Sequence, residues 1–347
     1  MSASSPRIDT RRRRQLLRAG AAACAGALAP SSHGASRARP ILVEFSHVVS
    51  ADTAKGRAAL YFKALAEART GGRVRVEVHP DSTLYKDREE LEALRMGAVQ
   101  MLAPSLSKLS ALGIGDFEVF DLPFLFRDQA AFRAVADGAL GAGLLQRLAP
   151  LGLQGLCYWD NGFKVFTANR PIHGPGDVRG LKVRVQASRT LVEQMRTLGA
   201  QVSVSPLANV FESLRTGQLD GQENVPSNIH SQRLHEAQSH LSVTRHGYLA
   251  YAVLTNRRFW ERLPDDIRQH LQAALREATR FANQIAEAEN HQALERIAAS
   301  GRVTMFTPSP LQLRQWREAL APVDAATRGW IDPQLAAAFR RAGAPPP

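Results

Sequence analysis

The order of predicted strands and helices is repeated in two separate segments of the chain, and this repeat restricts the fold more than any other feature. In residues 41–105, alternating apolar positions and amphipathic spacing predict strand, helix, strand, helix and strand in turn. Residues 181–225 predict the same order. In both segments a glycine, Gly97 or Gly217, ends the second helix, and the next strand runs toward a polar loop. We therefore expect an α/β protein with two similar lobes, whose strand ends face each other across a cleft.

Two further segments are expected to connect these lobes. Residues 157–172 predict a strand that crosses from one lobe to the other. Residues 264–300 predict an unusually long helix, with Pro264 and two aspartates in its first turn and Gly301 after its end. At about 1.5 Å per residue this helix would exceed about 50 Å, so we expect it to brace both lobes. The expected boundaries are residues 40–161 with 250–289 for the first lobe and residues 162–249 with 290–347 for the second.

The positive charge is concentrated at the N-terminus. The 347 residues carry a formal net charge of +12, and residues 1–39, with eight arginines and one aspartate, hold +7 of it. The remaining +5 is spread over the chain without a basic run. This distribution argues against a nucleic-acid-binding protein.

Residues 1–39 predict an export signal instead. An arginine cluster precedes an alanine-rich, weakly apolar stretch, which is the layout of such signals. Arg13 and Arg14 with the Gln-Leu-Leu-Arg that follows approximate the twin-arginine pattern, and a general secretory signal with a basic start is the alternative. No later apolar run is long enough to span a membrane. We expect a mature protein in the periplasm that is not embedded in the membrane.

No motif for metal, nucleotide or covalent chemistry is found in the sequence. Metal-ligand spacings, a nucleophile elbow, a P-loop and a dinucleotide fingerprint are all absent. Asp220 and Glu223 could form an acid pair, but near a strand end they are expected to make hydrogen bonds and hinge contacts. We expect no metal, no cofactor and no enzyme activity; a periplasmic enzyme acting on a carboxylate is the alternative from another class.

The few lysines are informative, because the chain has six of them and every other basic side chain is arginine. Lys55 falls in the first turn of a predicted helix, where its charge opposes the helix dipole unless an anion lies nearby. Lys164 lies where the chain enters the second lobe. Both are candidates for contact with an anionic ligand. His47, after the first strand, either satisfies local backbone groups or touches a ligand.

Arg184 is the candidate for orienting a ligand. In residues 181–188 the alternation places Val183 and Val185 on one face of a strand and Arg184 on the other. Arg184 is then either a solvent-exposed charge or a guanidinium that grips a carboxylate with two parallel hydrogen bonds. Asn224 lies at the end of the corresponding strand and could add amide contacts. Cationic groups on opposite sides of a small cleft would suit a dicarboxylate.

The same segments resemble the solute-binding subunits of TRAP transporters, most closely the DctP type that captures four-carbon dicarboxylates. The similarity is carried by "GLKVRVQAS", "TLGAQVSVSP", "LRTGQLDGQENVPSN" and "DNGFKVFTANRPI", and it extends from about residue 41 to about residue 300. The resemblance implies a two-lobed periplasmic-binding-protein fold (type II-like). Such a protein closes on its small carboxylate ligand and delivers it to the permease subunits in the membrane.

The resemblance also implies roles for single residues. The arginine that clamps a ligand carboxylate in this family falls on Arg184, and the asparagine after the aspartate–glycine strand falls on Asn224. The basic position that follows the asparagine–glycine pair falls on Lys164. Three further positions lie in motifs that line the same cleft in the dicarboxylate group: His47, Lys55 and Ser105.

One departure from the family pattern affects the ligand. Residues 207–209 read Leu-Ala-Asn where family members often have an aromatic–serine–glutamate run. This departure leaves the exact ligand open. The resemblance implies a dicarboxylate such as succinate, malate or fumarate, and a monocarboxylate or a sugar acid is the alternative. A ligand-sensing partner of a membrane receptor would use the same site without a permease.

Overall fold

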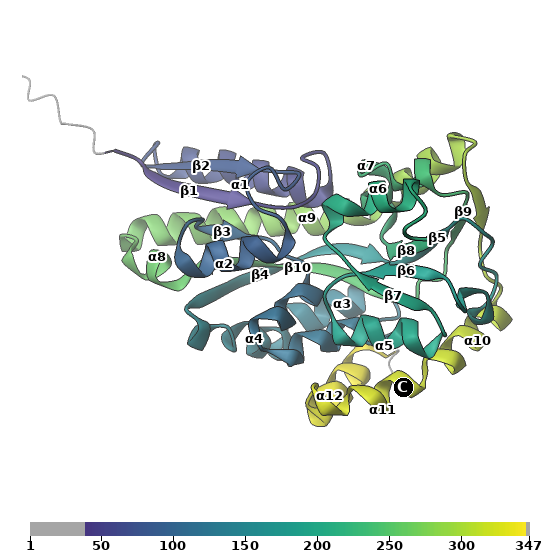
Figure 1. Ribbon diagram of the computed structural model, residues 1–347. Helices are drawn as coiled ribbons and strands as arrows, with labels where there is room; N and C mark the ends of the chain where they lie inside the picture. The colour runs from purple at the N-terminus through teal and green to yellow at the C-terminus, as the bar shows by residue number, and fades with distance from the viewer. Residues whose placement is uncertain (1–38, 345–347) are drawn as a thin grey trace, which may run out of the picture. The chain divides into compact units, whose positions relative to one another are not determined.

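In the computed structural model, which describes residues 39–344, the strands form two sheets (Figure 1). The first sheet contains β1 (Ile41–Ser46), β2 (Val74–His79), β3 (Met101–Leu102), β4 (Leu153–Phe163) and β10 (Tyr248–Asn256), in the order β2-β1-β3-β10-β4. The second contains β5 (Val165–Ala168), β6 (Lys182–Val185), β7 (Gln201–Val204), β8 (Gly221–Asn224), β9 (His240–Ser242) and β11 (Thr304–Phe306), in the order β11-β9-β5-β8-β6-β7.

Helices connect these strands and cover the sheets. The α-helices are α1 (Ala54–Arg69), α2 (Asp87–Met96), α3 (Gln129–Ala136), α4 (Ala139–Gln146), α5 (Arg189–Thr197), α6 (Val210–Arg215), α7 (Pro226–Ser231), α8 (Arg257–Arg262), α9 (Asp265–Ala299), α10 (Pro310–Leu320), α11 (Pro322–Ala326) and α12 (Pro333–Gly343). The 3-10 helices are η1 (Leu106–Leu112), η2 (Gly115–Asp121), η3 (Ala149–Leu151), η4 (Pro175–Val178), η5 (Leu207–Asn209), η6 (Leu234–Ala237) and η7 (Thr327–Gly329).

The predicted repeat is present in the topology of the two sheets. In the first sheet β1 pairs in parallel with β2 and β3, and in the second β6 pairs in parallel with β7 and β8. Each third strand has an antiparallel neighbour, β10 beside β3 and β5 beside β8. The predicted α/β fold with two similar halves is confirmed by this arrangement.

The glycines that end α2 and α6 have the predicted conformation. Gly97 and Gly217 have φ values of 79° and 72°, in the left-handed region where a Cβ would be strained. The chain can therefore reverse directly from each helix into the strand that lies beside β1 or β6.

The chain crosses between the sheets three times, and the third crossing runs through α9, which leads from β10 in the first sheet to β11 in the second. It leaves the first sheet at the end of β4 and enters the second at β5, and it returns between β9 and β10. The single strand predicted over residues 157–172 is therefore two strands in different sheets. They separate at Lys164, whose N–H donates to the carbonyl of Gly247 (2.9 Å) on the returning connection. The first two crossing connections thus lie side by side.

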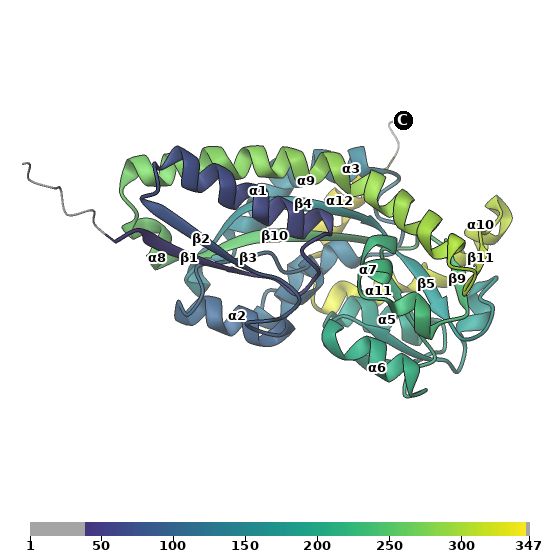
Figure 2. The same cartoon turned by 90° about the horizontal axis from the view of Figure 1, so that it is seen from above.

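The long helix α9 packs against the cores of both sheets, as predicted. Ile267 and Leu271, near its start, are buried in the core formed by the first sheet and α1. Ile297, near its end, is buried in a core that includes Val165 of β5. Figure 2 shows α9 beside α1 at one end and continuing toward β9 and β11 at the other.

The export signal and the lobe boundaries are not tested by the structure, whereas the expected lack of a membrane-spanning helix concerns the described residues. The export signal lies outside the described residues, apart from Arg39, and its twin-arginine pattern lies wholly outside them. The predicted lobe boundaries stay a prediction. Among the described residues, no helix combines the length and the apolar character needed to cross a bilayer.

Candidate functional site

A small cavity lies where the parallel strands of both sheets end. Ser105 follows β3 in the first sheet, and Gln186 follows β6 in the second, where Asn224 ends β8. Ligands of open α/β sheets bind at such carboxyl ends. The cavity is enclosed by side chains of both sheets. Its other lining residues are Val48, Val49, Lys55, Lys108, Arg184, Leu207, Asn228, Leu249 and Tyr251.

Arg184 is buried in the wall of this cavity, so the solvent-exposed alternative is wrong. Its side chain is 1% exposed. Nε and Nη2 donate to the carbonyl oxygen of Ser205 (2.9 and 2.7 Å), while Nη1 makes no hydrogen bond within residues 39–344. Burial lowers the pKa of Arg184, and the charges of Asp87 and Glu223 oppose that shift. One edge of the guanidinium is thus fixed by the backbone, and the other edge is open to an anion.

Lys55 reaches the same cavity from the first turn of α1. Its Nζ donates to the carbonyl of Ala103 (3.0 Å) and lies 3.9 Å from the centre of the Tyr251 ring. Within the described residues, no carboxylate lies within ion-pair distance of it. Burial, and then the nearby charge of Lys108, lowers the pKa of Lys55 to about 7. A bound carboxylate would stabilise this charge.

Asn224 and Ser105 add polar groups to the wall. Asn224 Oδ1 accepts from the N–H of Val225 (2.9 Å) and from Asn228 Nδ2 (3.1 Å), which fixes the orientation of the amide. The Nδ2 of Asn224 makes no hydrogen bond in the part of the chain that the structure describes. Ser105 Oγ donates to Gln186 Oε1, so side chains that follow strands of the two sheets touch across the cavity.

Two predicted site residues, Lys164 and His47, are buried but do not line this cavity. Lys164 Nζ lies 2.9 Å from Glu223 Oε2 and 3.9 Å from Asp121 Oδ1, so its charge is compensated within the protein. Burial, with the charge of Lys55, lowers the pKa of His47 to about 3, and neither ring nitrogen makes a hydrogen bond with another described residue. Their contact with a ligand stays a prediction.

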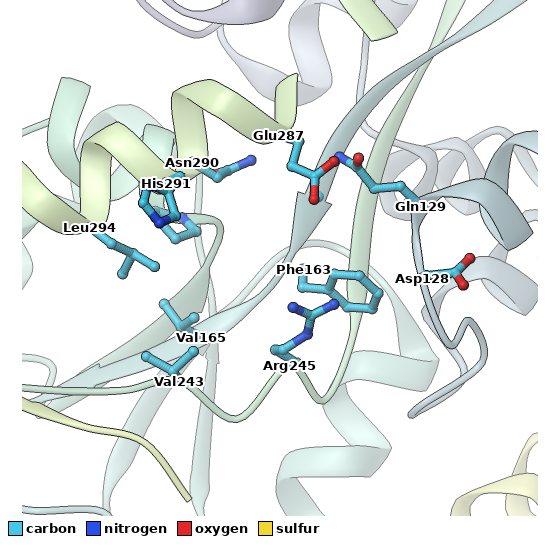
Figure 3. A pocket seen from close by; sticks show the side chains of 12 residues that line it. Asp128, Gln129, Phe163, Val165, Val243, Arg245, Glu287, Asn290, His291 and Leu294 are labelled. Atoms are coloured by element: carbon cyan, nitrogen blue, oxygen red, sulfur yellow. The ribbon is translucent and has the colours of Figure 1, made fainter. Parts of the chain in front are cut away.

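Another pocket, beside the first two crossing connections, contains none of the predicted site residues. It is lined by Phe163, Arg245 and side chains of α9, including Glu287 and Asn290 (Figure 3). Arg245, which has a φ of 49°, places its guanidinium 3.9 Å from the centre of the Phe163 ring. This contact joins the outgoing and returning connections to each other. The pocket shares no lining residue with the cavity.

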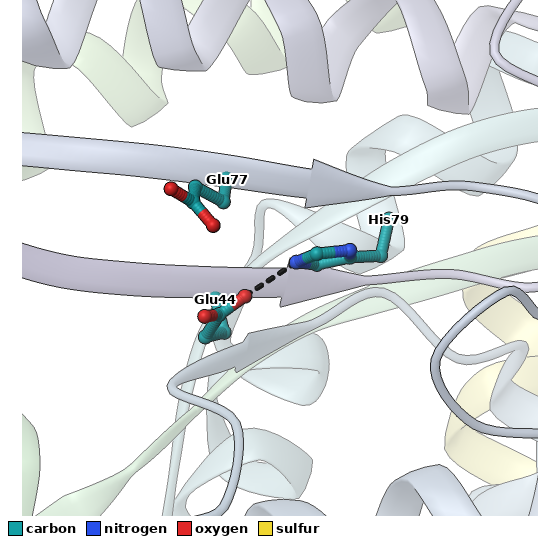
Figure 4. A group of neighbouring side chains, drawn as sticks. All are labelled: Glu44, Glu77 and His79. Atoms are coloured by element: carbon teal, nitrogen blue, oxygen red, sulfur yellow. Dashed lines mark hydrogen bonds and ion pairs between the residues drawn. The ribbon is translucent and has the colours of Figure 1, made fainter.

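One group of side chains on the first sheet has the composition of a metal site. Glu44, Glu77 and His79 lie on one face of the paired strands β1 and β2, with ligand atoms within 4.8 Å of one another (Figure 4). His79 Nε2 contacts Glu44, and Arg75 pairs with Glu77 at 2.6 Å. Each carboxylate therefore has a basic partner, Glu44 across the strands and Glu77 along β2, and these pairs account for the group. None of these residues lines the cavity.

Comparison with known proteins places the chain in a family. The family model of bacterial extracellular solute-binding proteins, family 7 (DctP), matches residues 45–327. The chain belongs to this family. The C4-dicarboxylate-binding periplasmic protein DctP of Rhodobacter capsulatus is 47% identical over 307 residues, which are 88% of this chain and 92% of that protein.

Solved structures of TRAP periplasmic solute-binding proteins have the same fold. The protein of Shewanella oneidensis with bound succinate has a TM-score of 0.86 and 40% identity over 88% of this chain and 100% of that chain. The protein of Pseudomonas aeruginosa with bound L-malate has a TM-score of 0.81 and 40% identity over 83% of this chain and 100% of that chain. The resemblance to TRAP solute-binding proteins is thus confirmed, and the family is one of binding proteins rather than enzymes.

Among the charged residues that line the cavity of this solute-binding protein, Lys108 is the one for which the sequence predicted no role. It lies in η1, is 6% exposed, and forms an ion pair with Asp87 of α2. Asp87 Oδ2 also accepts from the N–H of Leu207 (2.6 Å). Burial opposes ionisation of Asp87, but Lys108 and this hydrogen bond lower its pKa below the usual value. The available signal was the scarcity of lysine and the polar loop after the third strand.

Proposed function

We propose that the cavity binds a small dicarboxylate such as succinate, malate or fumarate, and that the protein delivers it to the permease of a TRAP transporter. The observation that carries the proposal is the charge of the cavity wall. Lys55, Lys108 and Arg184 line it, and no carboxylate does so among the described residues. With Asp87 paired to Lys108, these groups leave a formal charge of +2, which a dicarboxylate would neutralise.

The polar groups of the wall suggest how such a ligand would be held. The open edge of Arg184 would bind one carboxylate with two parallel hydrogen bonds. Lys55 would neutralise the other, and the Asn224 amide and the Ser105 hydroxyl would add hydrogen bonds. Lys164 and His47 are proposed to act less directly, because Lys164 is paired with Glu223 and His47 lies outside the wall.

Ligand capture would depend on closure of the two lobes. The proposed moving parts are residues 40–161 with 250–289 and residues 162–249 with 290–347. A ligand that contacts both lobes favours the closed state by the difference between its affinities for the closed and open states. Closure excludes water and strengthens each charged contact. The ligand would be released unchanged, and residues 1–39 would direct the chain to the periplasm.

A thermal-shift screen over organic acids tests the proposal on residues 40–347. At one hundred times the dissociation constant, a bound ligand stabilises the protein by about 2.7 kcal/mol, so a dicarboxylate should raise the melting temperature. Mass spectrometry of the recovered ligand should find it unchanged. A rise with a monocarboxylate or a sugar acid but with no dicarboxylate would contradict the proposed ligand class, and conversion of the ligand would contradict a pure binding role.

A further inference from the structure

We propose that Lys108 is a third ligand-binding cation that takes the carboxylate opposite Arg184, and that Asp87 is the residue that positions it. The inference rests on the proposed function and deepens it. It names a contact, in addition to that of Lys55, by which the site would distinguish a dianion from a monoanion of the same shape.

Lys108 has hydrogen-bonding capacity that the protein does not use. An ammonium group has three donors. The one hydrogen bond that Lys108 Nζ makes within the described residues goes to Asp87 Oδ1, so two donors are left. The side chain is 8% exposed and lines the cavity. Because buried donors without partners are unfavourable, a ligand oxygen in the cavity is the natural acceptor for them.

Asp87 fixes the ammonium group, and each of its two carboxylate oxygens already accepts a hydrogen bond from the protein. Its Oδ1 accepts from Lys108, and its Oδ2 accepts from the N–H of Leu207 at 2.6 Å. Leu207 lies two residues after Ser205, whose carbonyl holds the guanidinium of Arg184. The segment that orients Arg184 is thereby tied to the carboxylate that orients Lys108. The two cations are held by one connected set of contacts.

The two cations also reach the cavity from different sheets. Arg184 lies on β6 of the second sheet, and Lys108 lies in η1, which follows β3 of the first. Both side chains also line an adjoining pocket of about 920 Å³. A ligand with a carboxylate at each end could therefore bridge Arg184 and Lys108. Because such a ligand contacts both sheets, the binding of its second carboxylate would favour the closed state of the protein.

The charge balance favours a ligand with two negative charges. Lys55 and Arg184 contact uncharged partners, whereas Lys108 has Asp87 as its counter-ion. A monoanion would leave one buried cation uncompensated, which is costly. Glu90 of α2 is buried behind these groups, and burial raises its pKa to about 7. Protonated Glu90 carries no charge, so the formal charge of the groups around the cavity stays +2.

The test pairs two ligands with a charge-balanced variant. Succinate is compared with succinamate, in which a carboxamide replaces one carboxylate at nearly the same size. The double variant Lys108→Met with Asp87→Asn removes both members of the ion pair, so no buried charge is left unpaired and the formal balance stays +2. The asparagine keeps an acceptor for the N–H of Leu207. Lys63→Met with Glu67→Gln neutralises a matched, more exposed pair on α1 (2.9 Å) that does not line the cavity.

Isothermal titration calorimetry at pH 6.5 should show that wild-type protein prefers succinate. The Lys108/Asp87 variant should lower the succinate-to-succinamate affinity ratio roughly tenfold or more, the usual effect of losing a charged hydrogen bond. The Lys63/Glu67 control should keep the wild-type ratio, and thermal melts establish that each variant is folded. An unchanged affinity ratio, whether or not both affinities fall, overturns the proposed role of Lys108 and leaves the proposed function standing. Failure of wild-type protein to bind any dicarboxylate overturns the proposed function as well.

Discussion

At the scale of single residues, the cavity is set apart by buried positive charge that lacks a counter-ion. Lys55 contacts the carbonyl of Ala103 and the ring of Tyr251, and Arg184 contacts the carbonyl of Ser205. Uncharged partners only partly offset the loss of hydration when a cation is buried. A bound anion completes this compensation, so the same groups that are unfavourable in the empty cavity favour the loaded one.

This charge makes ligand binding depend on pH. The pKa of Lys55 is lowered to about 7 in the empty cavity, and a nearby ligand carboxylate would raise it. Lys55 is charged below pH 7 in both states, whereas above pH 7 binding requires it to take up a proton. The dissociation constant for succinate should therefore rise between pH 7 and 9, by at most about tenfold per pH unit.

Calorimetric titrations from pH 6.5 to 9 check this dependence, with Lys55→Met as the comparison. Glu90, whose pKa is raised to about 7, ionises in the same range and acts in the same direction. Asp87 is ionised and His47 is neutral throughout, since their pKa values are lowered. The Lys55→Met variant should keep only a weaker slope. Equal slopes in the two proteins would exclude Lys55 as the linked group.

The sequence predicts the site residues that lie at the ends of regular elements. Lys55 at the start of α1, Arg184 on β6 and Asn224 at the end of β8 were predicted, and all three line the cavity. Lys108 was assigned no role, because it lies in the 3-10 turns of η1, where no apolar period indicates the direction of a side chain. The pairing of Lys164 with Glu223 joins residues far apart in the sequence, and no local pattern could indicate it.

At the scale of elements, the order of strands and helices was predicted better than their lengths. The third strand was expected directly after Gly97, but β3 comprises Met101 and Leu102 alone. Its neighbours β1 and β10 pair with it over two residues each, so tertiary pairing rather than strand propensity sets its length. The start and the end of α9 were predicted closely, because both depend on local features. These are Pro264 with the acidic first turn at the start and Gly301 after the end.

The packing of α9 depends on small residues along one side. Ala278, Ala282 and Ala286 recur at four-residue spacing and are all 0% exposed. Ala282 belongs to the core that α9 shares with Phe62 of α1. Small side chains at these positions let the helix lie close to its neighbours, as Figure 2 shows for α1 and α9.

Enlarging one of these alanines should disrupt that packing. Ala282→Leu adds volume to a filled core and should lower the free energy of unfolding by about 1–3 kcal/mol. Ala288→Leu makes the same change at an exposed position of α9 and should alter it by less than about 0.5 kcal/mol. Urea denaturation of the two variants checks the difference. Equal stabilities would show that the alanine face does not set the distance between α9 and its neighbours.

At the scale of the whole molecule, the two sheets contribute opposite sides of one cavity. Ser105 contacts Gln186 across 81 residues of sequence, and Asp87 contacts Leu207 across 120. The repeated element order predicts that the strand ends face each other, but contacts between distant segments become visible only in the folded protein. A ligand held from both sides shifts the protein toward closure.

The central claim is that Arg184 holds one carboxylate of a dicarboxylate in this cavity. Calorimetric titration of succinate into wild-type protein and into the Arg184→Lys variant tests it directly. Wild-type protein should bind one succinate per chain, and the variant, which keeps the charge but loses the two parallel hydrogen bonds, should bind roughly 10- to 100-fold more weakly. Absence of succinate binding by wild-type protein, or equal affinity in the two proteins, would contradict the claim.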